Sequence, residues 1–258
     1  MYLSRKVLDW LTEKENPSVR YLSLKYLVNL PQKEPALMEA RKTAYREGAI
    51  SQILAKMNPE GWWVKPGAGY GPKYKSTVWA LIALGQLGAN ASDDLRIKTA
   101  CRYYLDHAFC PGGQISYNGT PSGTIDCLQG NMLAALADLG FTDPRIDTAY
   151  DWLARSTTGQ IDRYFAYKCG PCFACGPNGK KPCAWGAVKA MLALAKVPAT
   201  ERTPTINKAI KLGVAFLLSV VPSTAASPHT PLPPHTPGPA PRPPPAHDTH
   251  LHPPPHHP

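Results

Sequence analysis

The body of this 258-residue chain has almost no histidine. Seven of its eight histidines lie between residues 222 and 258, and only His107 lies in the body. With one histidine available there, neither a Ser-His-Asp triad nor a paired-carboxylate arrangement can be placed. The common forms of acid–base and nucleophilic hydrolysis are therefore not predicted.

The chain also lacks long apolar runs. No stretch reaches the roughly 18 apolar residues of a transmembrane helix, and residues 1–10 carry charge without the apolar segment of a signal peptide. Without a secretory signal, the seven cysteines favour thiols or metal ligands over a disulfide framework. We therefore expect a cytoplasmic protein with no transmembrane segment.

Long basic runs are absent as well, although the formal net charge is +10. No aromatic-basic motif of a nucleic-acid module appears, so we expect no nucleic-acid partner. Scattered pairs such as Lys73 with Lys75, and Lys180 with Lys181, fit solvated surfaces. An anionic ligand such as a diphosphate, or peripheral contact with a membrane surface, stays open.

What the body does contain is an internal repeat. Segments 75–88, 127–140 and 183–198 are rich in Ala and Leu and apolar around most of their circumference, which is typical of buried helices. Each precedes an amphipathic segment, at 93–107, 143–155 and 203–219. A glycine turn that runs into an aromatic residue recurs about every 50 residues, at Gly61, Gly112 and Gly159.

This unit predicts an all-α fold of α/α hairpin repeats, with about four helix pairs in residues 1–220. Segments 17–30 and 35–57 fit the first, less regular pair. A HEAT-like solenoid is the alternative, but the glycine-aromatic turns and the apolar first helices favour burial between an outer layer and a central core. The Pro/His-rich tail, residues 221–258, is predicted to be disordered. A metal- or partner-binding tail and a shifted reading frame are its two open explanations.

The turns and helix starts carry a family resemblance. Gln52–Trp63 and Tyr103–Tyr117 resemble terpenoid cyclase turns, in which a Gln-containing helix end runs into Gly and Trp. Cys127-Leu-Gln-Gly-Asn-Met, followed by Asp143-Pro-Arg, is similar to prokaryotic cyclase-like proteins. Over roughly residues 17–220 the chain resembles the terpenoid cyclase and protein prenyltransferase superfamily. The resemblance implies a partial α/α toroid and an apolar, isoprenoid-like ligand.

The chain departs from the catalytic motifs of that superfamily. It has no Asp-x-Asp-Asp acid box, and Asp93-Asp94 fits a helix cap instead. Asp126-Cys127 lacks the residue that separates the zinc-binding Asp and Cys of the prenyltransferases. His107 lies on a predicted outer helix and does not fit as the third zinc ligand. Standard cyclase chemistry is therefore not expected, and whether the chain is an enzyme stays open.

Aromatic residues gather at the turns and at the starts of the buried helices. In a toroid these positions line the central mouth, where cyclases hold an apolar chain and stabilise carbocations by cation–π attraction. The candidate ligand-binding residues are Trp62, Trp63, Tyr74, Trp79, Tyr117 and Trp185. The alternative is that these rings are core packing.

The sharpest chemical feature is a cysteine cluster in a loop of Gly and Pro. Two-residue gaps let neighbouring thiolates bind one metal, and Cys127 and Cys183 begin equivalent helices, where they would lie at the same height. The candidate metal ligands are Cys127, Cys169, Cys172, Cys175 and Cys183. Zinc is the first choice and an iron–sulfur cluster the second. Inert thiols and redox or disulfide chemistry are the alternatives.

Two functions follow from these features. The first is a cyclase-like α/α repeat protein that binds an apolar, isoprenoid-like small molecule. The second is a helical scaffold for a protein partner, stabilised by a zinc–thiolate site.

Overall fold

The structure, a computed structural model, describes residues 4–161, 173 and 182–219. Regular structure in these ranges is helical, with two isolated β-bridges, which confirms the all-α prediction. The α-helices are α1 (Arg5–Leu11), α2 (Pro17–Tyr26), α3 (Pro35–Glu47), α4 (Ala49–Ala55), α5 (Thr77–Gln86), α6 (Leu95–Ala108), α7 (Asp126–Asp138), α8 (Pro144–Thr157), α9 (Ala184–Lys196) and α10 (Pro204–Ser219). The predicted tail lies outside the described residues.

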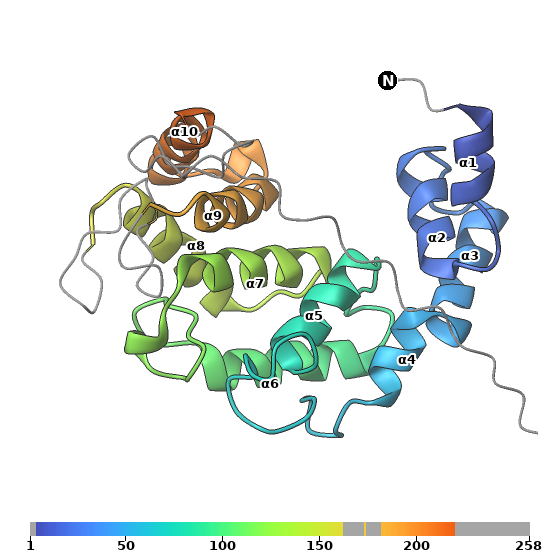
Figure 1. Ribbon diagram of the computed structural model, residues 1–258, viewed down its shortest axis with the longest axis horizontal. Coiled ribbons are helices and arrows are strands. Elements are labelled where there is room, and N and C mark those ends of the chain that lie inside the picture. Colours follow the sequence, from blue (N-terminus) through green and yellow to red (C-terminus); the bar gives the residue numbers. More distant parts are fainter. Residues whose placement is uncertain (1–3, 162–172, 174–181, 220–258) are drawn as a thin grey trace, which may run out of the picture.

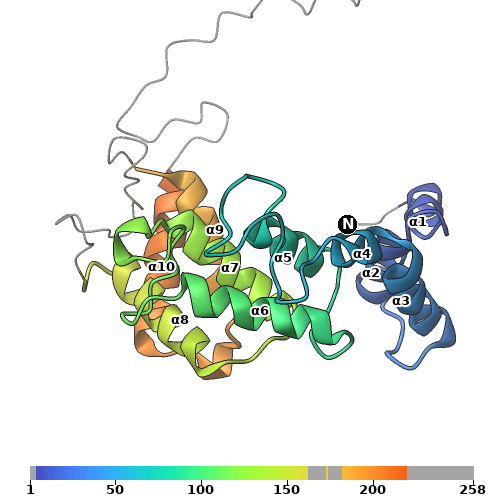
Figure 2. The same ribbon diagram turned by 90° about the horizontal axis from the view of Figure 1, so that it is seen from below.

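Helices α5 to α10 form three successive hairpins (Figures 1 and 2). Helix α7 packs between α5 and α9, and these three make an inner row. Helices α6, α8 and α10 pack on α5, α7 and α9 respectively, and α10 also contacts α8. Helices α2 and α3 form an earlier hairpin, which projects with α1 beyond one end of the array in both figures. The helical repeat is thus observed, and its curvature into a toroid stays a prediction.

The inner helices are apolar all round because neighbours cover them on several sides. Helix α7 buries Leu128, Met132, Leu133 and Leu136 against α5, α8 and α9. Its Gly130 lies so close to α9 that a Cβ there would be 2.3 Å from the Lys189 carbonyl carbon. The two backbones therefore meet almost directly. Within the described ranges, no helix has the length and apolarity needed to cross a bilayer.

The first two glycine turns pack on the outer helix of the following hairpin. Gly61 has a φ of 106°, and a Cβ there would lie 3.0 Å from the Thr99 carbonyl oxygen of α6. In the next turn the matching residue is Gly113, with a φ of 96° and 2.7 Å between such a Cβ and the Thr148 carbonyl oxygen of α8. The sequence prediction of Gly112 was therefore one residue early, because Gly113 is the residue with the left-handed backbone.

The predicted helix caps are confirmed. Asp94 Oδ1 accepts from the Arg96 backbone N–H at 2.9 Å at the start of α6. Asp143 Oδ1 accepts from the Arg145 backbone N–H at 3.0 Å at the start of α8, where Pro144 is the first helical residue. These side chains satisfy backbone donors that an α-helix leaves unpaired.

Candidate functional site

The three inner helices begin at the same end of the array. A Cβ on Gly186, in the first turn of α9, would lie 3.6 Å from Asp126 Cβ at the start of α7. At the other end, Lys196 of α9 pairs with Asp138 of α7. A Cβ on Gly85, near the end of α5, would lie 3.3 Å from Asp138 Cβ. The inner helices are therefore parallel, and their N-terminal ends, with partial positive charge, face one side.

Four aromatic rings form a continuous cluster at this end. The ring of Trp79, in the first turn of α5, lies 4.8 Å from that of Tyr74 and 5.7 Å from that of Tyr70, both in the preceding loop. Tyr70 also lies 6.0 Å from Tyr117, in the loop before α7. Trp79 Nε1 donates to the Tyr70 carbonyl oxygen at 2.9 Å, which fixes the indole. We call these four residues the aromatic surface.

The aromatic surface stays accessible to solvent. Tyr74 is 79 % exposed and Tyr117 is 45 % exposed, while Tyr70 and Trp79 are half-buried. Tyr74 has a φ of 66°, a left-handed backbone that is uncommon for a residue with a large side chain. Lys73 Nζ lies 5.8 Å from the centroid of the Tyr70 ring. The surface therefore combines exposed rings, a cation and an unusual backbone conformation.

The remaining tryptophans of the predicted site lie in different environments. Trp63 is buried, its indole N–H donates to the Ile53 carbonyl oxygen at 2.8 Å, and it belongs to the main core. Its position fits the core-packing interpretation. Trp62 is half-buried and its indole N–H donates to Glu60 Oε2 at 3.0 Å. Trp185 is exposed in the first turn of α9, with Lys189 Nζ 4.6 Å from the centroid of its ring.

Two of the candidate metal ligands lie in the described part of the chain. Cys127 is in the first turn of α7, and Cys183 is the N-cap of α9, where its Sγ accepts from the Gly186 backbone N–H at 3.3 Å. Both are at helix starts, as predicted. They do not lie at the same height along the helix axes. Gly186, three residues after Cys183, faces Asp126, which directly precedes Cys127. Cys183 is therefore shifted along the axis by about one helical turn, on the order of 6 Å, relative to Cys127.

One residue of the cysteine loop, Phe173, belongs to the described part of the chain. Cys169, Cys172 and Cys175 lie outside the described residues, whereas Phe173 is described and is buried against the start of α9. A Cβ on Gly186 would lie 3.4 Å from Phe173 Cβ and 3.7 Å from Cys183 Sγ. The described residues alone contain no group of three or more Cys, His, Asp or Glu side chains able to hold a metal.

Cys101, Cys110 and His107 lie on α6 or directly after it. Cys101 and Cys110 are buried, and desolvation raises the pKa of Cys101 to about 12 and that of Cys110 above its usual value. His107 lies on outer helix α6, as expected, with Nδ1 2.8 Å from the Tyr103 carbonyl oxygen and its ring stacked on that of Tyr103. None of the three is placed at the aromatic surface.

The candidate site is defined by this geometry. Tyr70 joins the predicted Tyr74, Trp79 and Tyr117 in one cluster, and Cys183 lies at the equivalent end of α9. Comparison of the chain with protein-family models, with curated proteins and with solved structures found no match.

Proposed function

We propose that the chain binds an apolar, isoprenoid-like ligand on the aromatic surface at the N-terminal ends of α5 and α7. The observation that carries this proposal is a ring cluster built by two successive repeats that nevertheless stays exposed. Rings that serve packing in this chain are buried, as Trp63 and Tyr104 are. Exposed rings grouped in one patch are typical of a binding site.

The physical chemistry of the surface favours a branched hydrocarbon with an anionic end. An aromatic side chain offers 150–250 Å² of surface, and covering apolar area stabilises a complex by roughly 25 cal/mol per Å². Lys73 beside Tyr70, together with the positive ends of the inner helices, favours a negative head group such as a diphosphate. The proposal assigns binding and no reaction, because the chain lacks the acid box of the cyclases.

Titration with farnesol and with farnesyl diphosphate tests this proposal, with isothermal calorimetry as the readout. Tyr74→Ala is the informative variant, because the side chain is 79 % exposed and its removal leaves the core intact. We expect the Kd of both compounds to rise at least tenfold. Trp10→Ala, which removes another exposed ring on α1, is the matched control and should leave the Kd unchanged. Equal Kd values in the two variants would contradict the proposal.

A second candidate function is a helical scaffold for a protein partner, stabilised by a zinc–thiolate site that includes Cys127 and Cys183. It is favoured by Phe173, whose Cβ and Cys183 Sγ both lie within 4 Å of the Cβ position of Gly186 in α9. Cys172 and Cys175 flank Phe173 in the sequence and would supply further thiolates. Asp126, which is buried beside Gly186, adds a carboxylate to the same neighbourhood.

The surface of α9 supports the protein partner in this second function. Trp185, Val188 and Leu192 follow each other at helical spacing and are 62 %, 46 % and 42 % exposed. In the inner row, α5 and α7 each use such a face to pack against the next inner helix. The face of α9 therefore has the composition of a helix–helix contact.

Zinc content per chain distinguishes the second function from the first. The full chain, Cys183→Ser and Cys101→Ala are purified in parallel without an added tag and analysed by mass spectrometry of the metal. Serine retains the helix cap, so Cys183→Ser should fold and lose one equivalent of zinc. Cys101→Ala should keep it, because Cys101 is a core residue of α6. Identical zinc content in all three would contradict a site at Cys183.

A further inference from the structure

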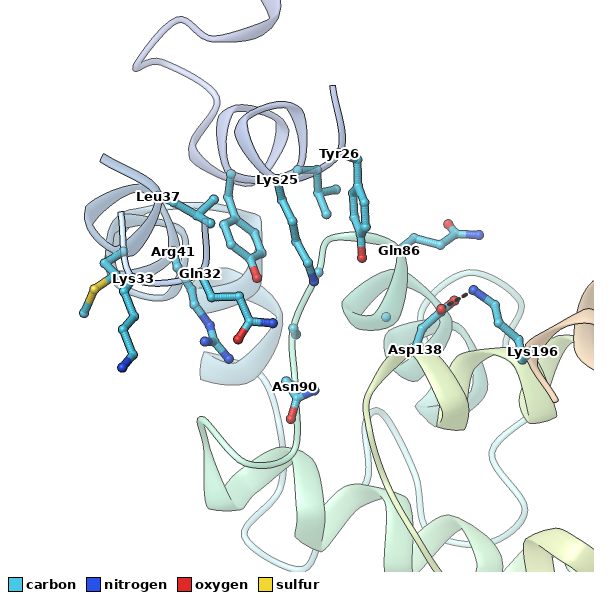
Figure 3. Close-up of a pocket in the computed structure, with 16 residues that line it drawn as sticks. Lys25, Tyr26, Gln32, Lys33, Leu37, Arg41, Gln86, Asn90, Asp138 and Lys196 are labelled. Atoms are coloured by element: carbon cyan, nitrogen blue, oxygen red, sulfur yellow. Dashed lines mark hydrogen bonds and ion pairs between the residues drawn. The ribbon is translucent and has the colours of Figure 1, made fainter. Parts of the chain in front are cut away.

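A concave surface lies at the opposite end of the inner row from the aromatic surface. It is a groove of about 680 Å³ between the α2–α3 hairpin and the C-terminal ends of α5, α7 and α9. Figure 3 shows Lys25 and Tyr26 projecting from α2 toward the segment that carries Gln86 and Asn90. This volume lies in the range of roughly 300–1,000 Å³ that is usual for small-molecule sites.

Cations outnumber carboxylates in the lining of this groove. The charged side chains that line it are Lys25, Lys33, Arg41, Lys196 and Asp138. Lys196 is paired with Asp138, and Arg41 with Asp93 beside the groove. Among the described residues, Lys25 and Lys33 have no carboxylate partner. They leave two positive charges for a ligand.

The ends of the inner helices oppose these charges only weakly. A helix C-terminus carries about half a negative charge, which comes from its unpaired carbonyl groups. At the end of α5, the backbone N–H groups of Leu87, Gly88 and Ala89 bond the carbonyl oxygens of Ala83, Gly85 and Leu84. Because the turn satisfies those carbonyls, the formal charges of the lysines decide the sign of the groove.

The walls of the groove are held in place by polar contacts. Arg41 Nε donates to Asp93 Oδ2 at 2.9 Å, and the Tyr45 hydroxyl donates to the same oxygen at 3.0 Å. The Tyr45 hydroxyl also accepts from the Asn90 backbone N–H at 2.7 Å. These contacts fix α3 to the turn between α5 and α6. A ligand therefore meets a preformed groove, which lowers the entropy cost of binding.

One wall offers an aromatic face next to the free lysine charge. Tyr21 and Leu37 are buried in that wall, while Tyr26 is 66 % exposed. Lys25 Nζ lies 5.7 Å from the ring centroid of Tyr21 and 4.8 Å from that of Tyr26. A ligand that combines a flat apolar group with an anion would contact both the ring of Tyr26 and the ammonium group of Lys25.

We propose that this groove binds a small organic anion, a phosphate monoester or a carboxylate that carries an aromatic group. The anion pairs with Lys25, the aromatic group lies on Tyr26, and Lys33 adds a second unpaired positive charge to the same groove. The site is separate from the aromatic surface and does not depend on the function proposed for it.

The test uses the full chain and saturation-transfer NMR with three probes of similar size. Phenyl phosphate and benzoate represent the two anions, and benzyl alcohol is the neutral counterpart. We expect saturable binding of at least one anion, weakened at least tenfold in Lys25→Glu/Lys33→Glu. Lys208→Glu/Lys211→Glu, an equal charge change on the exposed face of α10, should bind like the unaltered chain. Circular dichroism melting checks that both variants are folded.

The outcomes separate as follows. Preference for phenyl phosphate or for benzoate identifies the anion class, and loss of binding as salt rises from about 0.05 M to 0.5 M supports the lysine pairing. Benzyl alcohol binding as tightly as the anions would overturn the proposal. So would equal weakening in the two double variants, or the absence of saturable binding for all three probes.

Discussion

The Ile115 backbone N–H donates to Gln129 Oε1 at 2.6 Å, across 14 residues of sequence. The same spacing recurs one repeat earlier, where the Trp63 backbone N–H donates to Thr77 Oγ1 at 3.1 Å. In both cases a side chain of an inner helix accepts from the amide two residues after the turn glycine. The glycine turns are thus held by the helix that follows them.

Gln129→Ala is expected to destabilise the array strongly. The buried Gln129 amide also donates to the Gly113 and Ala149 carbonyl oxygens, at 3.0 and 3.1 Å. Each buried group left unpaired costs about 1–3 kcal/mol, so we expect a loss of about 3 kcal/mol or more in the free energy of unfolding. Urea denaturation measures it. Gln52→Ala on the exposed side of α4 is the control, and a similar loss there would remove the role assigned to Gln129.

Two glycines with left-handed backbones should respond differently to alanine. Gly113→Ala introduces a methyl group 2.8 Å from Trp152 Cβ as well as strain at a φ of 96°. Gly159 has a φ of 71° and open space around it, so Gly159→Ala adds strain alone, about 1–2 kcal/mol. We expect Gly113→Ala to lower the free energy of unfolding by about 1–3 kcal/mol more than Gly159→Ala does. Equal melting temperatures would show that the turn does not pack on α8 as described.

Gly130→Ala should separate α7 from α9. Alanine favours an isolated helix by about 1 kcal/mol over glycine, but the added methyl group would lie 2.3 Å from the Lys189 backbone. Overpacking of this kind costs about 1–3 kcal/mol or more. We therefore expect net destabilisation, measured by urea denaturation. Gly186→Ala, in α9 with no contact closer than 3.4 Å, is the comparison, and a stabilised Gly130→Ala variant would contradict the close contact.

Acid sensitivity is expected at the start of α8. The hydrogen bond from the Arg145 side chain holds the pKa of Asp143 below its usual value of 3.8. A lowered pKa in the folded state adds stability above the unfolded pKa, and that stability is lost as pH falls through the folded value. Asparagine keeps the cap, so Asp143→Asn should be less stable than the unaltered chain at about pH 7. The difference in free energy of unfolding between the two proteins should disappear below about pH 4. Thermal melts of both proteins across this pH range measure the difference in stability.

The partner arginine gives the control for this pH effect. In an Arg145→Met background the charge of Asp143 has lost its main partner, so Asp143→Asn should change the pH dependence little. If Asp143→Asn still caused the same pH-dependent loss of stability in this background, the pH effect would belong to a group other than the Asp143–Arg145 pair.

The fold was predictable because its signals are local. Apolar inner segments, capping residues Asp94 and Asp143, and the recurring turns all lie within a few residues of the structure that they determine. The matching glycine was placed one residue early, because Gly112 and Gly113 are neighbours and only packing on α8 distinguishes them. The boundaries of inner helices α5 and α7 also follow the predicted segments.

The site was predictable only in part, because its geometry depends on contacts between repeats. Tyr74, Trp79 and Tyr117 were predicted, but the position of Tyr70 between Trp79 and Tyr117 follows from the packing of α5 on α7. Trp63 is buried and bonded to Ile53 of α4 and Thr77 of α5, and its position in the sequence does not distinguish it from the exposed rings. The offset between Cys127 and Cys183 likewise depends on how deeply α9 slides along α7.

The basic groove had no signal in the sequence. Lys25 and Lys33 are eight residues apart on different sides of a turn, and the other wall comes from residues more than fifty positions later. Isolated lysines in a sequence indicate solvated surface, and only the fold shows that two distant segments bring them to one groove. A run of basic residues can be recognised in a sequence, whereas a basic site formed by separate helices cannot.

The forward contacts of the Gly61 and Gly113 turns give the array a direction. The turn at Gly61 packs on α6 and is held by α5, and the turn at Gly113 packs on α8 and is held by α7. During synthesis, a hairpin that has just left the ribosome therefore has an unanchored trailing turn until its successor emerges. Removing hairpins from the C-terminal side would release turns that remain in the chain, whereas removing them from the N-terminal side would leave the later turns anchored. Each of these two turns therefore reaches its final contacts only when the hairpin after it is in place.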